Sequence, residues 1–393
     1  MMIVGTRPQF IKSSILARIL EEDREIKLQL IHTGQHYQFE MSQIFFQDLN
    51  FPKPDLNLNV GSGSHAQQTA LMMMKLEEVM LDMNPDIVLV PGDTNSTLAG
   101  ALTAIKLHIP VGHIEAGLRS YDLNMPEEIN RRLTDHCSTL LFAPTNTAVK
   151  NLLQEGIKMD SIFHVGDTMV DVLQSYMPLA RKYSNILYEL NLERDSYALL
   201  TLHRPENVDN KRRFKTILKA LRGLKELQII FPIHPRTKKM ARKFGLYEDL
   251  RKTPNIHLID PVGYLDFIVL MENSKIILTD SGGVQKEAFL LGVPCVTLRY
   301  NTEWIETVEL GCNFLVGANE KIITETIKVL IKNDRLKEKI KFSPNPFGDG
   351  TASQRILTII KRQYADGKLK ITSPNMLKML NPNHLHQDRN ATN

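Results

Sequence analysis

The residues best suited to chemistry lie between positions 113 and 132, where a histidine, arginines and several carboxylates follow a short apolar segment. That segment, residues 111–114, is predicted to be a strand, and Glu115 leaves it directly. Met125-Pro126 predicts the start of a helix, because proline is favoured in a first helical turn. Functional groups of parallel α/β sheets gather where strands end, so this stretch is the first candidate for a site.

The predicted helix after position 125 has two distinct faces. Apolar residues recur on it at every fourth position and are expected to form its buried face: Ile129, Leu133 and Cys137. The charged residues on the rest of the helix can be explained as surface ion pairs four residues apart: Glu127 with Arg131 and Glu128 with Arg132. From the helix alone, that explanation is better than a functional one.

Composition limits the classes of function. The chain has 393 residues, of which 42% are hydrophobic and 23% charged, as in globular proteins of two or three domains. A net charge of +4 gives no reason to expect a nucleic-acid partner. Three widely spaced cysteines without a C-x-x-C pair predict buried thiols in a reducing compartment. With no apolar run long enough to span a bilayer and no signal peptide before the first strand, a cytoplasmic location without membrane contact is expected.

Apolar strands alternate with helices in two series, which predicts two consecutive α/β halves of similar size. The expected strands of the first half are residues 1–4, 29–33, 87–91, 111–114, 140–143 and 163–165. Those of the second half are residues 198–202, 228–233, 257–259, 275–278, 295–298 and 314–316. A polar helix and connector over residues 177–193 should join the two halves.

Several of these strands end in polar residues. Residues 5–7 offer backbone N–H groups, a hydroxyl and a guanidinium to an anion, although Arg7 could equally be a solvated loop residue. Asp93 follows the third strand, either as part of a site or as the cap of the next helix. His203 and His234 follow strands of the second half, each close to an arginine, but without the spacing of metal ligands.

The clearest phosphate signal is the turn Ser281-Gly282-Gly283. A buried strand runs into it and a helix follows, whose free N–H groups and dipole favour an anion. Two glycines let a phosphate approach the backbone, and a purely structural turn is the alternative.

A second glycine-rich stretch, residues 61–68, matches a dinucleotide fingerprint in its letters only. The strand that should precede it is weak, and Ser64 with Gln67 makes a capping box for a helix over residues 65–83. The methionines on that helix are expected to fill the core. We therefore reject a dinucleotide site here.

A diphosphate site in one half and carboxylates in the other indicate a cleft enzyme that acts on a nucleotide sugar. Without a dinucleotide fingerprint, redox chemistry at the sugar lacks its cofactor, and neither a cofactor nor a metal is expected. Elimination needs neither, because one group removes a carbon-bound proton while the stabilised diphosphate leaves. The carboxylates and His203 are candidates for the proton transfer.

The chain resembles the non-hydrolysing UDP-N-acetylglucosamine 2-epimerases in seven blocks: GTRPQFIK (5–12), GDTNST (92–97), HIEAGLRS (113–120), PEEINR (126–131), HRPEN (203–207), DSGGVQKEA (280–288) and GDGTAS (348–353). The resemblance implies the glycosyltransferase-B fold, in which two Rossmann-like α/β domains face a cleft. The expected division is an N-terminal domain with the catalytic carboxylates over 1–170, a UDP-binding domain over 171–350, a helix crossing back over 351–365, and a polar tail over 366–393.

The resemblance also implies a reaction. Anti elimination of UDP gives 2-acetamidoglucal, and re-addition gives the C2 epimer, UDP-N-acetylmannosamine. The catalytic residues carried over are Asp93, Glu115, Glu127 and His203, and the motif does not settle which group takes the C2 proton. The residues expected to bind substrate or UDP are Arg7, Lys12, Arg119, His234, Ser281, Gly282, Gly283 and Glu287, the last on the ribose hydroxyls. A homodimer and a role in surface polysaccharide synthesis are implied as well.

Three positions depart from the commonest family pattern. Gln9 replaces a frequent glutamate, and Trp304 replaces an arginine that helps hold the nucleotide in many members. Both resemble the branch acting on UDP-2,3-diacetamido-2,3-dideoxy-glucuronic acid, which is the alternative substrate. Gln67 stands where some members have an arginine of an allosteric site, for which the candidates here are Gln35, His36, Gln67 and Gln68. A glycosyltransferase, which would need an acceptor, and a nucleotide-sugar sensor without turnover are the alternatives of other classes.

Overall fold

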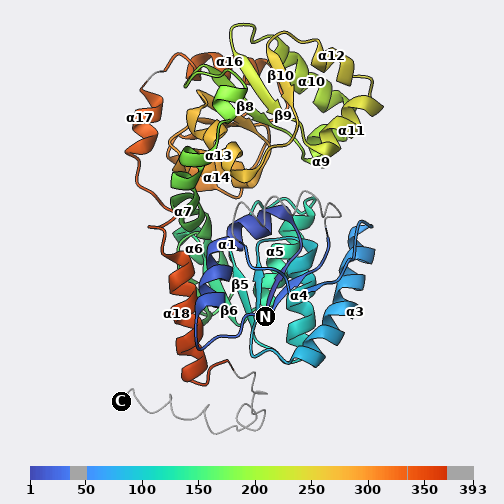
Figure 1. The fold of residues 1–393 in the computed structure, drawn as a ribbon, viewed down its shortest axis with the longest axis vertical. Helices are drawn as coiled ribbons and strands as arrows, with labels where there is room; N and C mark the ends of the chain where they lie inside the picture. The colour runs from blue at the N-terminus through green and yellow to red at the C-terminus, as the bar shows by residue number, and fades with distance from the viewer. Residues whose placement is uncertain (36–50, 334, 370–393) are drawn as a thin grey trace, which may run out of the picture.

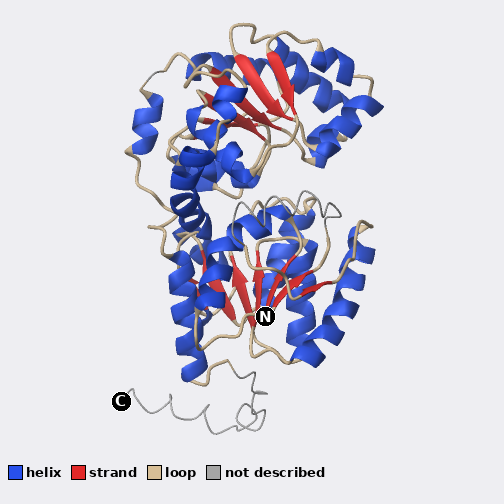
Figure 2. Cartoon of the chain, in the orientation of Figure 1, coloured by secondary structure: helices blue, strands red, loops and turns tan. Residues whose placement is uncertain are grey.

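The computed structural model describes residues 1–35, 51–333 and 335–369, and in it two α/β units lie one above the other along the long axis (Figure 1). Each unit has a parallel sheet with helices on both faces (Figure 2). Parallel strands need crossover connections, and helices supply them while covering the apolar faces of the sheet. The predicted α/β class with two consecutive halves is confirmed.

The first sheet has seven strands in the order β3-β2-β1-β4-β5-β6-β7. Its strands are β1 (Met2–Val4), β2 (Leu30–His32), β3 (Leu56–Asn57), β4 (Val88–Pro91), β5 (Val111–Ile114), β6 (Leu140–Ala143) and β7 (Ile162–His164). Its helices are α1 (Arg7–Glu22), α3 (His65–Met83), α4 (Asn95–Lys106), α5 (Pro126–Cys137) and α6 (Asn146–Gln154), with a 3₁₀ turn at Met159–Ser161. The six predicted strands lie within a residue of their expected ends, and the edge strand β3 is additional.

The second sheet has six strands in the order β10-β9-β8-β11-β12-β13. Its strands are β8 (Tyr197–Thr201), β9 (Gln228–Pro232), β10 (Ile256–Ile259), β11 (Ile276–Thr279), β12 (Cys295–Thr297) and β13 (Asn313–Leu315). Its helices are α9 (Pro205–Val208), α10 (Lys211–Arg222), α11 (Pro235–Lys243), α12 (Tyr247–Arg251), α13 (Tyr264–Asn273), α14 (Gly282–Leu290), α15 (Ile305–Glu309), α16 (Glu320–Leu330) and α17 (Leu336–Lys341). All six strands were predicted, again within a residue at each end.

Both sheets reverse their strand order beside their first strand. In the first sheet β1 pairs with both β2 and β4, and in the second β8 pairs with both β9 and β11. Ligands of open α/β sheets bind at such switch points, beyond the carboxyl ends of the strands. The loops after β1, β4, β8 and β11 are therefore the expected places for a site.

Two helices join the units. The expected helix and connector over residues 177–193 begin too late, because α7 runs over Thr168–Tyr183, with Pro178 inside it, and the short α8 (Ile186–Glu189) follows. The last helix, α18 (Ala352–Ala365), returns to lie beside the first unit, where it packs against α1 and α7 (Figure 1). The Asp171 carboxylate on α7 accepts hydrogen bonds from the first backbone N–H groups of α18. The predicted domain boundaries stay predictions, and most of the predicted tail lies outside the described residues.

Helix α3 agrees with its predicted structure. Ser64 and Gln67 form the capping box at its start, as expected. Met72 and Met80 are buried, whereas Met74 is exposed, so only part of the methionine stripe fills the core.

Helix α5 contradicts its predicted orientation. Ile129 and Leu133, expected in the core, are 44% and 46% exposed, whereas Glu128, Asn130 and Arg131 are buried. The buried polar residues have partners on neighbouring elements, which offset the cost of their desolvation. The pattern correctly placed Ile129 and Leu133 on one face of α5, but that face is exposed and the opposite, polar face is buried.

Among the helices of residues 1–35, 51–333 and 335–369, none is long and apolar enough to cross a membrane.

Candidate functional site

A cavity of about 960 Å³ lies between the two units and is lined by residues of both. From the first unit it receives Arg7 and Lys12, on α1 just after β1. From the second unit it receives five predicted site residues: His203, His234, Ser281, Gly283 and Glu287. The structure thus brings together seven of the residues predicted from strand ends and family blocks.

Glu115 lies beside this cavity, buried directly after β5. Its backbone has a positive φ of 69°, uncommon for a residue with a side chain. Oε2 accepts a hydrogen bond from Lys12 Nζ at 2.6 Å, and Oε1 accepts one from Lys286 Nζ at 3.1 Å. Burial alone would raise the pKa of Glu115, but the two lysines outweigh it and hold the pKa well below its ordinary value. Glu115 is therefore ionised at neutral pH.

Asp93 follows β4 and is not the cap of the next helix. Thr94 caps α4 and accepts from the backbone N–H of Thr97. The Asp93 carboxylate instead accepts from Arg131 Nη2 at 2.6 Å and keeps 26% of its side chain exposed. Of the two explanations offered for Asp93, helix capping is thus excluded.

His113 contacts the loop that carries Asp93. The carbonyl of Gly92 lies 2.7 Å from His113 Nε2, and Asp135 Oδ1 lies 2.6 Å from Nδ1. Both imidazole nitrogens therefore face acceptors, and His113 fixes the peptide next to Asp93.

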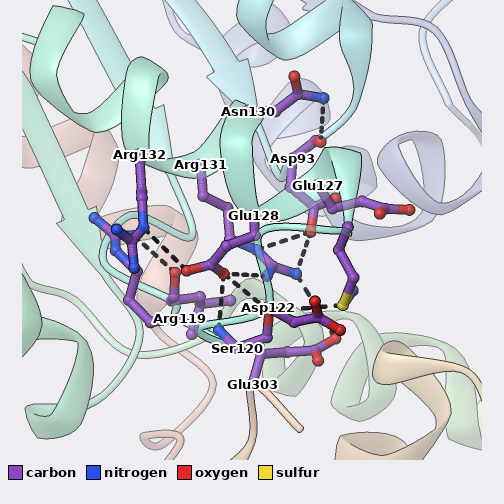
Figure 3. Close-up of polar contacts among 12 residues, drawn as sticks. Asp93, Arg119, Ser120, Asp122, Glu127, Glu128, Asn130, Arg131, Arg132 and Glu303 are labelled. Carbon is purple, nitrogen blue, oxygen red and sulfur yellow. Dashed lines mark hydrogen bonds and ion pairs between the residues drawn. The ribbon is translucent and has the colours of Figure 1, made fainter. Parts of the chain in front are cut away.

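The buried polar face of α5 surrounds Arg131 (Figure 3). Its guanidinium lies between Asp93 and Glu128, with Glu128 Oε2 at 3.2 Å from Nη1. Glu303 of the second unit lies 3.8 Å away. Glu128 also accepts from the backbone N–H of Ser120 at 2.8 Å. The ion pairs predicted on the surface of α5 are partly wrong, because Glu128 pairs with Arg131 as well as Arg132 and is fully buried.

Glu127 also lies at the junction of the two units. It accepts a hydrogen bond from Arg204 Nη1 at 3.1 Å and does not pair with Arg131 as expected. One third of its side chain, 34%, is exposed. Arg204 directly follows His203, which lines the cavity, so the ion pair with Arg204 places Glu127 close to the cavity.

His203 follows β8 and reaches the cavity beside Asp280. Its Nδ1 lies 3.4 Å from Asp280 Oδ1, and its ring centroid lies 5.4 Å from that of His234, with the two planes tilted by 36°. Burial and the charge of Arg204 outweigh Asp280 and lower the pKa of His203. The imidazole is therefore neutral near pH 7 and has a free lone pair for a proton or a hydrogen bond.

The turn at the start of α14 has the features of an anion site. Ser281 is the N-cap but makes no side-chain capping bond. A Cβ on Gly282 would lie 1.9 Å from Glu303 Oε1, so any other residue there would force the buried Glu303 carboxylate to move. A Cβ on Gly283 would meet nothing within 4 Å, which leaves its backbone open toward the cavity. A phosphate could therefore approach the free N–H groups of this helix.

Glu287, one turn further along α14, faces the same cavity. It accepts a hydrogen bond from the Tyr264 hydroxyl at 3.0 Å. Burial raises the pKa of Glu287 to about 7, although nearby lysines and Arg7 lower it. Arg7 itself donates to the carbonyl of Val262 at 3.2 Å, and burial lowers its pKa to about 10. Arg7 is thus not the solvated loop residue that was the alternative.

Arg119 is not brought together with these residues. It is buried between Asp135, at 2.7 Å, and Glu155, at 2.6 Å. This arrangement gives Arg119 a structural role beneath β5, and its role in binding stays a prediction.

Two of the candidates for an allosteric site, Gln35 and Gln68, contact the start of α4. Gln35 Oε1 accepts from the backbone N–H and the hydroxyl of Ser96, and Gln68 Oε1 accepts from Asn95 Nδ2 at 2.9 Å. Gln67 completes the capping box of α3. His36 lies outside the described residues. A regulatory role for this group stays a prediction.

Two of the unusual positions have clear structural roles. Gln9 is buried, accepts from the N–H groups of Gly5 and Thr6, and donates to the carbonyl of Pro91. A glutamine can make these bonds of both kinds, whereas an ionised glutamate has no donor. Trp304 is buried, and the ammonium of Lys286 lies 4.2 Å above its ring.

Sequence reasoning missed several polar residues at the junction of the units: Asp167, Arg204, Asp280, Lys286, Arg299 and Glu303. Asp280 and Lys286 lie within a block that was singled out, and Arg204 follows a candidate histidine, so strand-end position was a usable signal for these three. Within the described ranges, no group of three or more His, Cys, Asp or Glu side chains is arranged to hold a metal ion.

A sequence profile of the UDP-N-acetylglucosamine 2-epimerase family matches residues 18–361. The chain belongs to this family. It is 50% identical over 363 residues to the UDP-N-acetylglucosamine 2-epimerase of Methanocaldococcus jannaschii, covering 91% of this chain and 97% of that protein. The crystal structure of that epimerase in complex with UDP-GlcNAc and UDP matches with a TM-score of 0.87, over 92% of this chain and 99% of the other.

The family also contains a relative with another substrate. The UDP-2,3-diacetamido-2,3-dideoxy-D-glucuronate 2-epimerase of Pseudomonas aeruginosa is 45% identical over 358 residues, covering 90% of this chain and 97% of that protein. The chain is thus similar to epimerases named for each of the two substrates considered from the sequence, and its sequence identity is higher to the N-acetylglucosamine epimerase.

Proposed function

We propose that this epimerase family member is an isomerase that inverts C2 of UDP-N-acetylglucosamine to give UDP-N-acetylmannosamine. The observation that carries the proposal is that the cavity brings Lys12, which binds the buried, ionised carboxylate of Glu115, together with the α14 turn and His203 of the other unit. Asp93 follows β4, the strand that pairs with the one before Glu115. The sugar would lie between the carboxylates and the turn, with its diphosphate at the N-terminus of α14.

The reaction is an elimination followed by its reversal on the other face. A base removes the proton from C2, the electrons of that C–H bond form the C1–C2 double bond, and the C1–O bond breaks with its electrons leaving on UDP. UDP then adds back to 2-acetamidoglucal while a proton is delivered to C2 from the opposite side. Glu115, Asp93, Glu127 and neutral His203 are the candidates for these two proton transfers.

The leaving diphosphate must be held while it carries its full charge. Arg7 and the N–H group of Gly283 are positioned for this task, since both line the cavity. Glu287 would accept hydrogen bonds from the ribose hydroxyls. If UDP stays bound between elimination and re-addition, it adds back to the 2-acetamidoglucal intermediate and does not dissociate into solvent.

The second candidate substrate is the 2,3-diacetamido glucuronate sugar nucleotide, favoured by the 45% identity to the Pseudomonas aeruginosa epimerase. The same elimination applies to it, because the reacting bonds at C1 and C2 are unchanged. The two substrates are therefore compared in one experiment.

The test is proton NMR of each UDP-sugar incubated with purified protein in D₂O without added cofactor or acceptor. Deuterium at C2 together with the C2 epimer is the expected result, and the faster substrate is the physiological class. Asp93→Asn and Glu115→Gln should each reduce exchange by about 10²- to 10⁴-fold. Asp249→Asn, an exposed carboxyl on α12, is the matched control and should react as the wild type does.

Absence of exchange in both sugars, with UDP still bound, would contradict the proposal and favour a sensor. Turnover that appears only after an acceptor is added would identify a glycosyltransferase.

We further infer that the enzyme is a homodimer and that it works in the cytoplasm. The two exposed apolar residues of α5, Ile129 and Leu133, support a partner surface. Cys137, Cys295 and Cys312 are free thiols, which supports a reducing compartment.

A further inference from the structure

Lys286 is a fully buried lysine that reaches from one unit into the other. It lies on α14, between the glycine turn and Glu287, and its Nζ donates to Glu115 Oε1 across the junction. Nζ also donates to the Asp167 carboxylate, and it lies above the ring of Trp304. An ammonium held by two carboxylates and an aromatic face has the partners that burial of a charge requires.

Asp167 connects this contact to the joining segments of the two units. Its carboxylate accepts from the backbone N–H of Met169 and so caps α7, the helix that joins the units. Its own N–H donates to the carbonyl of Phe347, and the ring of Phe347 packs edge-on against Trp304 at 5.5 Å. Lys286 thus lies where the α14 helix, α7 and the returning chain before α18 meet.

The charged groups around Glu115 and Lys286 come from several elements. Glu115 is faced by Lys12 from α1, Lys286 from α14 and Asp167 before α7, and Asp93 acts on Lys12 from the loop after β4. Glu287 is the acidic neighbour of Lys286 on its own helix. If α14 withdrew, Glu115 would lose Lys286 and keep Lys12 as a cationic partner.

We propose that Lys286 is a positioning residue that couples occupation of the α14 turn by UDP to the placement of Glu115 in the other unit. Lys286 follows Gly282 by one helical turn, so a diphosphate that fixes the start of α14 also fixes the ammonium against Glu115. The proposal rests on the proposed function for the role of Glu115 in turnover, but the mechanical link between α14 and Glu115 does not depend on it.

The first measurement needs no turnover. Hydrogen exchange of the peptide spanning Glu115 is followed by mass spectrometry with and without saturating UDP. UDP should slow exchange there in the wild type and in Lys286→Arg, which keeps the charge, but not in Lys286→Met. Lys215→Met on α10, an exposed lysine, is the matched control. Equal protection in wild type and Lys286→Met, or no protection in the wild type, would overturn the proposal.

The second measurement separates positioning from folding. In Lys286→Met, kcat should fall by about 10- to 100-fold while KM and the Kd of UDP change by less than about 3-fold. The acidic limb of the kcat profile should move to higher pH, because Glu115 loses one of its two cations. Parallel loss of UDP affinity with an unchanged pH profile would mean a merely structural role and would overturn the proposal.

A further variant covers the possibility that Lys286→Met does not fold, since it leaves two buried carboxylates with less compensation. The double variant Asp167→Asn, Lys286→Met restores the local charge balance and still lacks the ammonium, so its pH profile should shift less than that of Lys286→Met. It must show the same loss of UDP-dependent protection at the peptide that spans Glu115, and full protection there would overturn the proposal. Wild-type protein without turnover on either sugar would contradict the proposed function alone, and the exchange measurement would still decide the role of Lys286.

Discussion

Glu287 is a buried carboxyl that faces the candidate ligand cavity, and its ionisation lowers the stability of the folded protein. The sequence placed it on the ribose hydroxyls by resemblance, and the structure adds a hydrogen bond from Tyr264 and an environment that raises its pKa to about 7. A carboxyl poised near neutral pH can be protonated in the empty protein and ionised when a ligand donates hydrogen bonds to it.

The raised pKa of Glu287 predicts a pH-dependent stability. Between the unfolded value of 4.5 and the folded value of about 7, the native state holds a proton that the unfolded chain has lost, so stability falls as pH rises through this window. Glu287→Gln removes this titration while keeping an acceptor for Tyr264. Urea unfolding at pH 5 and pH 8 should therefore show the variant gaining about 3 kcal/mol on the wild type, an order-of-magnitude figure.

The control for this titration is Glu309→Gln, which changes an exposed carboxyl at the end of α15. Its stability difference from the wild type should be the same at both pH values. A difference between Glu287→Gln and the wild type that did not change with pH would show that Glu287 ionises normally.

Helix α5 is the element where position in the fold overrides sequence pattern. Its charged residues are buried because each finds a partner, and Glu128 alone accepts from Ser120, Arg131 and Arg132. Its apolar residues face outward. Apolar residues at every fourth position predict an apolar helix face. The pattern does not tell whether that face packs in the core of the protein or in an interface between molecules.

The buried face of α5 predicts a large cost for losing Glu128. Glu128→Ala leaves Arg131 with less compensation and the Ser120 N–H without its acceptor, so the free energy of unfolding should fall by about 3–5 kcal/mol. Glu128→Gln, which keeps an acceptor oxygen, should cost less. The matched control is Glu325→Gln on α16, an exposed residue 3.8 Å from Lys321, which should cost less than about 0.5 kcal/mol. Equal urea midpoints for Glu128→Ala and Glu325→Gln would refute the buried-network view of α5.

At the scale of the whole molecule, the sequence was enough to predict the strands and the site residues in the loops that directly follow them. The strands were found from apolar runs, and Asp93, Glu115, His203 and Ser281 from the rule that sites lie at their carboxyl ends. Residues whose role depends on the meeting of the two units were missed. Lys286 and its partner Glu115 are 171 positions apart, and nothing local in the chain indicates that they touch.

The outward apolar face of α5 supports a last prediction, on assembly. An exposed pair such as Ile129 and Leu133 costs solubility in a monomer but contributes to the apolar centre of an interface that buries about 800 Å² on each partner. Light scattering after size exclusion should give the wild type twice the chain mass of 44.8 kDa. The double variant Ile129→Asp, Leu133→Asp should run at 44.8 kDa, because two carboxylates would be buried unpaired in the interface. Phe342→Asp, at an exposed aromatic residue after α17, should remain dimeric, and a wild type that stays at the single-chain mass at all concentrations would exclude the dimer.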